Sequence, residues 1–175
     1  LKFILSPVIG TGIKGFKGDL TANTVVTVAD LKALKASTQG DLTLSGAALN
    51  STFVNVKAAD IISAFKDVTT TATMTGLITI KETITLAQAE ELSALTTGVV
   101  TATIAPATAA DLLDATFKPT DVLSVTVKGA YTATDLIDLD AETQFDKISL
   151  SNKAQALTVD AADVAGLVTA LDNTG

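Results

Sequence analysis

A helix-start signature recurs along this chain at nearly even intervals. In it, Thr is followed three residues later by Asp or Gln, just before an apolar run, which is the pattern of an N-terminal capping box. The four complete copies and two with a changed first residue are Thr27/Asp30, Thr85/Gln88, Thr108/Asp111, Thr132/Asp135, Lys57/Asp60 and Asp160/Asp163. The second residues of successive copies lie 30, 28, 23, 24 and 28 positions apart. This spacing is typical of repeat proteins in which each unit is one supersecondary element.

Helix and strand patterns alternate around these signatures. The residues after each signature are apolar at spacings of three and four, as on one face of a helix, and the Asp160 copy could still cap through a carboxylate. Between the expected helices, apolar and hydroxyl residues alternate as in strands with one buried face, over residues 42–45, 100–104, 123–127 and 147–151. Residues 70–86 indicate two or three short strands and no helix. Residues 152–159 are interpreted as another short strand before the last helix.

The order of these elements predicts an α/β fold. Helices that carry the chain from one strand to the next favour a parallel sheet. Strands covered on both faces would be continuously apolar, so the hydroxyl residues indicate helices on one face only. We therefore expect a solenoid-like stack of about five or six helix-strand units over residues 24–175, with a largely parallel sheet. Only 4% of the residues are aromatic, which suits a thin two-layer stack built from small aliphatic side chains.

The N-terminal segment, residues 1–23, fits no unit and is expected to be a cap or an edge segment. The chain begins at Leu1 without Met, which indicates a fragment of a longer polypeptide or a processed chain. The stretch from Leu1 to Val8 could be extended and add to the sheet edge of a neighbouring molecule. Homo-assembly through this segment or through a sheet edge is therefore one expectation for the partners of the chain.

The composition argues against several classes of function. The chain has no His, Cys, Trp or Arg and a formal net charge of -7. It therefore lacks thiolate ligands, the usual proton shuttle and the bidentate phosphate clamp, and its charge disfavours nucleic acid. No apolar run approaches the roughly 20 residues that span a bilayer. We expect a protein that is not an enzyme, has no cofactor and does not insert into a membrane.

Two sets of surface residues remain as candidate sites. The first is an acidic cluster of Asp135, Asp138, Asp140 and Glu142, which supplies the oxygen ligands that Ca²⁺ prefers. Acidic residues are also common in the first turn of a helix, and the glycine of an EF-hand loop is missing here. The second is the hydroxyl face of the sheet, made of Thr101, Thr103, Ser124, Thr126, Ser149 and Ser151, although Thr is simply common on exposed strand faces.

Residues 86–104 and 132–143 carry a resemblance to known proteins. They look like the helix-strand repeats of very large secreted or cell-surface bacterial proteins of the adhesin type, including cyanobacterial ones. The resemblance extends over roughly residues 24–175 and transfers no catalytic residue. It implies an extracellular or cell-surface setting, with neighbouring copies or modules of the same large protein as partners.

Three functional hypotheses follow. The first is a non-catalytic structural repeat segment of a large extracellular surface, matrix or filament-forming bacterial protein. The second is a binding module of an adhesin that uses the Ser/Thr sheet face for a glycan, for ice or for a calcium-assisted ligand. The third is a compact α/β domain with a small-molecule function. The shape of the molecule in solution separates the third hypothesis from the first two.

Overall fold

The helix starts are the most regular feature of the structure, a computed structural model that describes residues 16–174. All four complete signatures form capping boxes. In each box, the Thr hydroxyl accepts a hydrogen bond from the backbone N–H of the Asp or Gln three residues later. The side chain of that Asp or Gln accepts a hydrogen bond from the backbone N–H of the Thr. The helices in the described residues are α1 (Val28–Ser37), α2 (Ala58–Phe65), α3 (Leu86–Leu95), α4 (Ala109–Asp114), α5 (Ala133–Ala141) and α6 (Val164–Asn173), with a short 3-10 helix η1 (Gly46–Asn50).

The two altered signatures behave differently. Lys57 makes no side-chain cap at the start of α2. Instead, Glu82 Oε1 accepts a hydrogen bond from the N–H of Ala58 at 3.0 Å, so this helix is capped from a neighbouring strand. The expectation of a cap from Asp160 is wrong, because α6 begins only at Val164, after Asp163, which makes no side-chain cap bond.

The strands form two sheets in which every pair is parallel, as the alternation of helix and strand predicts. They are β1 (Leu20–Ala22), β2 (Leu42–Leu44), β3 (Phe53–Val54), β4 (Val68–Thr70), β5 (Ile78–Ile84), β6 (Val100–Ile104), β7 (Val122–Val127) and β8 (Phe145–Leu150). The first sheet has the order β1-β2-β4, and the second has the order β3-β5-β6-β7-β8. The chain is therefore an α/β protein with six helices and two parallel sheets over residues 16–174.

For three segments the sequence-based expectations have different outcomes. Residues 70–86 have no helix before Leu86, as expected, but in place of two or three short strands they contain the last residue of β4 and one strand of seven residues, β5. Residues 152–159 form no strand, so that prediction is wrong; the segment is irregular, and Leu157 and Val159 pack partly buried against the core. Within residues 1–23, β1 joins the first sheet, whereas residues 1–8 lie outside the described part of the chain.

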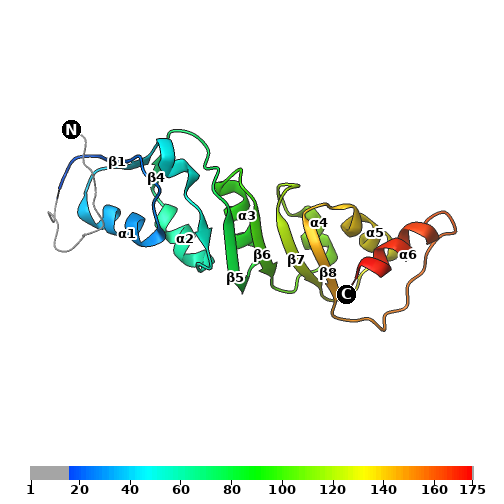
Figure 1. Cartoon of the computed structure of the whole chain (residues 1–175). Coiled ribbons are helices and arrows are strands. Elements are labelled where there is room, and N and C mark those ends of the chain that lie inside the picture. The colour runs from blue at the N-terminus through cyan, green and yellow to red at the C-terminus, as the bar shows by residue number, and fades with distance from the viewer. Residues whose placement is uncertain (1–15, 175) are drawn as a thin grey trace.

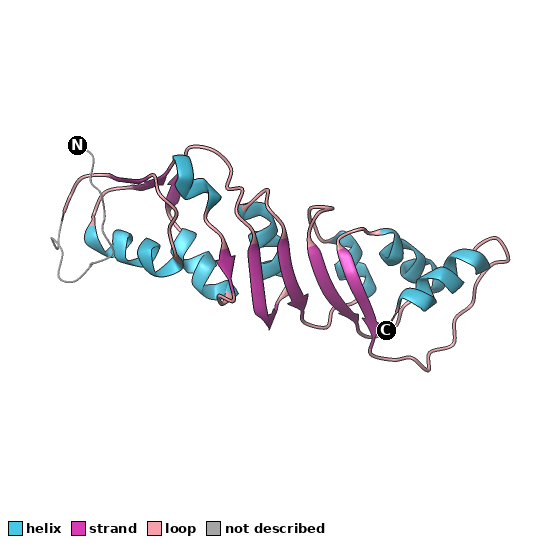
Figure 2. Ribbon diagram, in the orientation of Figure 1, coloured by secondary structure: helices cyan, strands magenta, loops and turns pink. Residues whose placement is uncertain are grey.

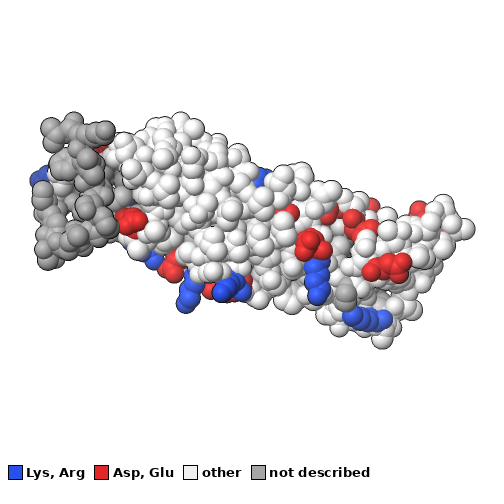
Figure 3. All heavy atoms as spheres, viewed as in Figure 1, with Lys and Arg blue, Asp and Glu red and all other residues white. Residues whose placement is uncertain are grey.

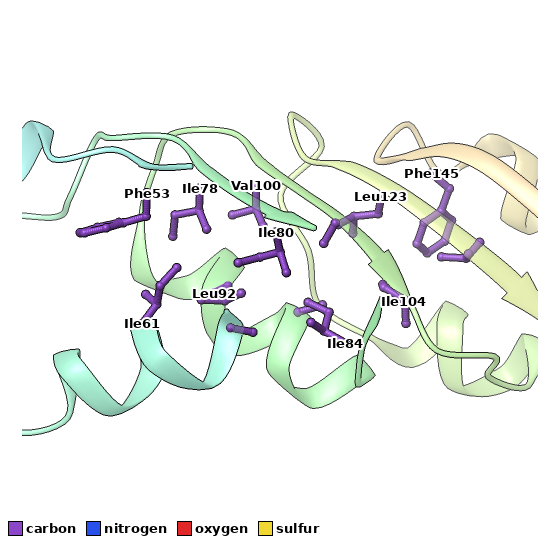
Figure 4. Packing of buried hydrophobic residues seen from close by; sticks show 14 of the residues in the cluster. Phe53, Ile61, Ile78, Ile80, Ile84, Leu92, Val100, Ile104, Leu123 and Phe145 are labelled. Atoms are coloured by element: carbon purple, nitrogen blue, oxygen red, sulfur yellow. The ribbon is translucent and has the colours of Figure 1, made fainter. Parts of the chain in front are cut away.

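The core lies between the strands and the helices. Figure 4 shows Ile78, Val100 and Leu123 on neighbouring strands above the helices that carry Ile61 and Leu92. In this region the helices lie on one side of the strands. Figures 1 and 2 show the elements following one another along the long dimension of the molecule, with β1 and α6 towards opposite ends.

Candidate functional site

The acidic cluster is spread over α5 and its C-terminal end. Asp135 belongs to a capping box, where its Oδ2 accepts from the N–H of Thr132 at 2.7 Å. Asp140 Oδ1 accepts from Asn173 Nδ2 of α6 at 2.8 Å. Glu142 Oε2 accepts from Gln144 Nε2 at 2.9 Å, and Asp138 is exposed. Two of the four acidic side chains thus hold structural elements in place, and a third bonds a side chain two residues on.

A hollow of about 300 Å³ adjoins this cluster. Asp140 and Glu142 line it, together with Asp146 of β8 and Asn173 of α6. Nevertheless, no three Asp or Glu residues among residues 16–174 come together as a group that could hold a metal ion. Calcium binding by Asp135, Asp138, Asp140 and Glu142 stays a prediction that a calorimetric titration can test.

The hydroxyl face is assembled on three neighbouring strands. Thr103 of β6 lies opposite Ser124 of β7, and Thr126 of β7 lies opposite Ser149 of β8. The row continues onto β5, where Thr79 lies opposite Thr101 and Thr83 opposite Thr103. Ser151 follows the end of β8, and its Oγ donates to the carbonyl of Val127 at 2.8 Å. The structure therefore brings the predicted hydroxyl residues together, with Ser151 already engaged by the backbone.

This face offers hydrogen bonds but no aromatic platform among the described residues. The single Tyr of the chain, Tyr131, is buried, and its hydroxyl donates to the carbonyl of Asn152. Sugar rings commonly stack on aromatic side chains, whose faces are apolar and rigid. Any ligand of the hydroxyl face would have to be bound through the Ser and Thr hydroxyls and Lys147, which lies opposite Ser124.

A buried polar network links three segments that are far apart in sequence. The Asp121 side chain is inaccessible to solvent, and its Oδ2 accepts from Ser93 Oγ at 2.5 Å. Its Oδ1 accepts from the N–H of Val100 at 2.9 Å and lies 3.0 Å from Lys118 Nζ. Lys118 Nζ also donates to the carbonyl of Ser93 at 2.7 Å. The network ties α3, the start of β6 and the loop before β7 together.

This network was not predicted from the sequence. Its members are separated by up to 28 residues, and none of them belongs to a recognised motif. The available signals were Ser93 directly after the core residue Leu92 and an acid directly before β7. All the charges and hydrogen-bonding groups in it are paired with each other, and no buried side-chain N or O atom in the described part of the chain lacks a partner. The arrangement is that of a structural crosslink.

The capping boxes at α3 and α4 allow a matched stability test. The Thr85 box uses an amide, Gln88, whereas the Thr108 box uses the carboxylate of Asp111. We expect Thr85→Ala to destabilise the fold by about 1 kcal/mol, because a Ser or Thr cap typically contributes that much. The loss should be similar at neutral and acidic pH. Urea unfolding gives the value, and Thr134→Ala, an exposed change inside α5, is the control that should leave stability nearly unchanged.

The Thr108 box should instead depend on pH. The hydrogen bond from the Thr108 hydroxyl lowers the pKa of Asp111, and the Thr108 N–H and the charge of Lys128 act in the same direction. A carboxyl whose pKa is lower in the folded state stabilises that state above its unfolded pKa, and the stabilisation is lost as the pH falls through the folded value. Thr108→Ala should therefore cost more stability at neutral pH than in strong acid. An equal cost at both pH values would contradict this.

The described residues contain no candidate membrane span, and the comparisons with known proteins find no match. Among residues 16–174, no helix has the length and apolar character that a membrane span needs. The chain matches no model of a known protein family, no curated protein and no solved structure.

Proposed function

We propose that this chain is a non-catalytic structural segment, in which helix-strand units stack as a solenoid with the helices on one face. The stack serves as a semi-rigid spacer or assembly element in a large extracellular surface, matrix or filament-forming bacterial protein. Stability in such a stack comes from each unit and from its contacts with the next one. No catalytic residue and no cofactor is part of this proposal.

The observation that carries the proposal is a turn that occurs in the same form in two distant units. Thr38 Oγ1 donates to the carbonyl of Gly18 at 2.5 Å, and Thr96 Oγ1 donates to the carbonyl of Gly76 at 2.7 Å. In both cases the partners are 20 residues apart, and the N–H of the glycine two positions on donates to the Thr hydroxyl at 2.9 Å. The recurrence of the same bonds in two distant parts of the chain supports a stack of similar units.

Contacts between successive helices support the same arrangement. Lys32 of α1 forms an ion pair with Asp60 of α2, and Asp140 of α5 accepts from Asn173 of α6. The strand pairs β5-β6, β6-β7 and β7-β8 likewise join consecutive units. The extracellular setting rests on the resemblance of residues 86–104 and 132–143 to repeats of large bacterial surface proteins.

Small-angle X-ray scattering of the full chain, extrapolated to zero concentration, tests the stack. A compact domain of this length has a radius of gyration of about 16 Å. We expect a clearly larger radius and a pair-distance distribution with the long tail of a rod. A symmetrical distribution with the compact radius would contradict the spacer and favour the compact α/β domain with a small-molecule function.

The hydroxyl face supports a second candidate, a binding module of an adhesin. Hydroxyls in register on neighbouring strands, such as Thr103 opposite Ser124, present regularly spaced donors and acceptors to a ligand. Glycan arrays, ice-growth inhibition and Ca²⁺ titration cover the three expected kinds of ligand. Binding that disappears in Thr101→Val/Thr103→Val and persists in Thr73→Val, an exposed change outside these strands, would establish this candidate.

A further inference from the structure

Helix α6 has two apolar faces, of which one is covered. Leu167 and Ala170 are 8% and 1% exposed and belong to the core. Val164, Val168 and Leu171 are 46%, 53% and 41% exposed. Spacings of four and three place these exposed residues on one face of the helix. We call Val164, Val168 and Leu171 the outer α6 face.

The position of Val168 in its helix indicates what belongs on this face. Val168 follows the buried Leu167, just as Ile62 follows Ile61 in α2 and Ile137 follows Leu136 in α5. In those helices the residue faces the next helix of the row. Ile62 lines a hollow together with Gln88, Glu91 and Leu95 of α3. Ile137 lies beside Gly166 of α6, where an added Cβ would meet its side chain at 3.5 Å. The outer α6 face is thus turned towards the place of a following helix.

The sheet is open in the same direction. β8 is the last strand of its sheet, and Thr174, directly after α6, forms a parallel bridge with Ile148 on β8. The backbone after α6 therefore begins to lie along β8 as a next strand would. At the opposite end, β1 pairs only with β2 within the described residues. Within residues 16–174, β1 and β8 are thus the outermost strands towards the two ends of the molecule.

The charges of the two ends are opposite. Residues 133–174 contain two Lys and eight acidic residues, a net charge of -6, whereas residues 16–66 contain five Lys and four acidic residues, a net charge of +1. Figure 3 shows acidic side chains near the end of the molecule that carries α6. Phe16 and Val25 near β1 are 42% and 63% exposed, so the basic end also presents apolar side chains. Opposite charges favour a contact between unlike ends and oppose contacts between like ends.

We propose that the outer α6 face docks on the β1 and α1 end of a second copy of this chain, so that copies join head to tail. The contact continues the helix row through α6 and α1 and aligns the edge of β8 with the edge of β1. It rests on the proposed stack of units. Because such a contact uses different surfaces on the two copies and does not close on itself, it generates filaments rather than dimers.

Sedimentation velocity of the full chain at increasing concentration tests this proposal. The wild-type chain should form longer species as concentration rises, and added salt should weaken them because the ends attract through opposite charges. Val168→Asp should weaken association by about tenfold or more, since it places a charge in an apolar contact. The matched control is Val54→Asp, a change at a residue of similar exposure, 52%, on β3. A wild-type chain that stays monomeric at every concentration would overturn the proposal.

The direction of the contact can be read by crosslinking, because the chain has no Cys of its own. A Val168→Cys chain mixed with a Val25→Cys chain should form mainly mixed disulfide dimers on mild oxidation. A majority of Val168→Cys homodimers would show that two α6 faces pair, which overturns the head-to-tail arrangement. Scattering from the Val168→Asp monomer keeps the two proposals apart, because an extended monomer supports the spacer whatever the result of the assembly experiments.

Discussion

Replacing Asp121 by Ala should lower the free energy of unfolding by about 3–5 kcal/mol, the range expected when one partner of a buried ion pair is removed. The substitution removes both acceptors of the network. The Ser93 hydroxyl, the N–H of Val100 and the ammonium of Lys118 would lose their partner on Asp121 at once. Lys118 keeps its bond to the Ser93 carbonyl and is partly exposed, so the lower half of the range is the closer expectation. Urea unfolding followed by circular dichroism measures the loss.

Asp114→Ala is the matched control for this prediction. Asp114 is exposed at the end of α4, so its removal should change stability by less than about 0.5 kcal/mol. A double-mutant cycle of Asp121→Ala with Lys118→Ala separates the ion pair from the other bonds. The double variant should lose less stability than the two single variants together, since the groups share one network. Additive losses, or equal losses in Asp121→Ala and Asp114→Ala, would show that the network does not hold α3, β6 and β7 together.

The helix starts and the strands between them could be predicted because the signals are local. A capping box is complete within four residues, so Thr85 and Gln88 predict the start of α3 without information from the rest of the chain. Alternation in residues 123–127 likewise identifies the buried face of β7, where Leu123, Val125 and Val127 are buried. Parallel pairing followed from the order of the elements alone. These features together carried the α/β assignment.

The missed features depend on contacts between distant residues. Ser93 and Asp121 look like ordinary surface residues in the sequence, and only the stacking of α3 beside the loop before β7 buries them together. The N-terminus of α2 is completed by Glu82, which lies 24 residues beyond Ala58. Leu157 and Val159 alternate with Thr158 as in a strand, but they pack on the core from an irregular segment. Local periodicity cannot distinguish this from a strand.

The candidate sites also include features that local sequence patterns predict and features that depend on tertiary packing. The sequence could group Thr103, Ser124, Thr126 and Ser149, because strand alternation assigns residues to a face and parallel pairing places the faces side by side. It could not place Asp140 against Asn173, which requires the position of α6 on α5. The outer α6 face could not be predicted from the sequence either. Leu167 and Val168 are both apolar, and only packing decides which of them is covered.

The second prediction with a large expected effect concerns Gly76 and Gly98 in the repeated turn. Gly76 is buried, and a Cβ added there would lie 1.8 Å from the carbonyl oxygen of Ser51 in the preceding unit. A Cβ added at Gly98 would lie 2.5 Å from the carbonyl oxygen of Gly76. The backbones at Ser51, Gly76 and Gly98 therefore lie against one another at this turn, with no space for a side chain. We expect Gly76→Ala to cost roughly 3 kcal/mol, because the backbone of one unit must move away from the next.

Two other glycines show whether the close approach is the cause. Gly129 has a φ of +76° with nothing within 4 Å of an added Cβ, so Gly129→Ala should cost only about 1 kcal/mol, from backbone strain alone. Gly166 lies inside α6 with ordinary space around it, and Gly166→Ala should stabilise the fold by about 0.5–1 kcal/mol through helix propensity. Urea unfolding of the three variants should rank Gly76→Ala lowest and Gly166→Ala highest. If Gly76→Ala and Gly129→Ala were equally stable, the stacked turns would not be in backbone contact, and the repeated Thr-x-Gly turn would lose its role in joining the units.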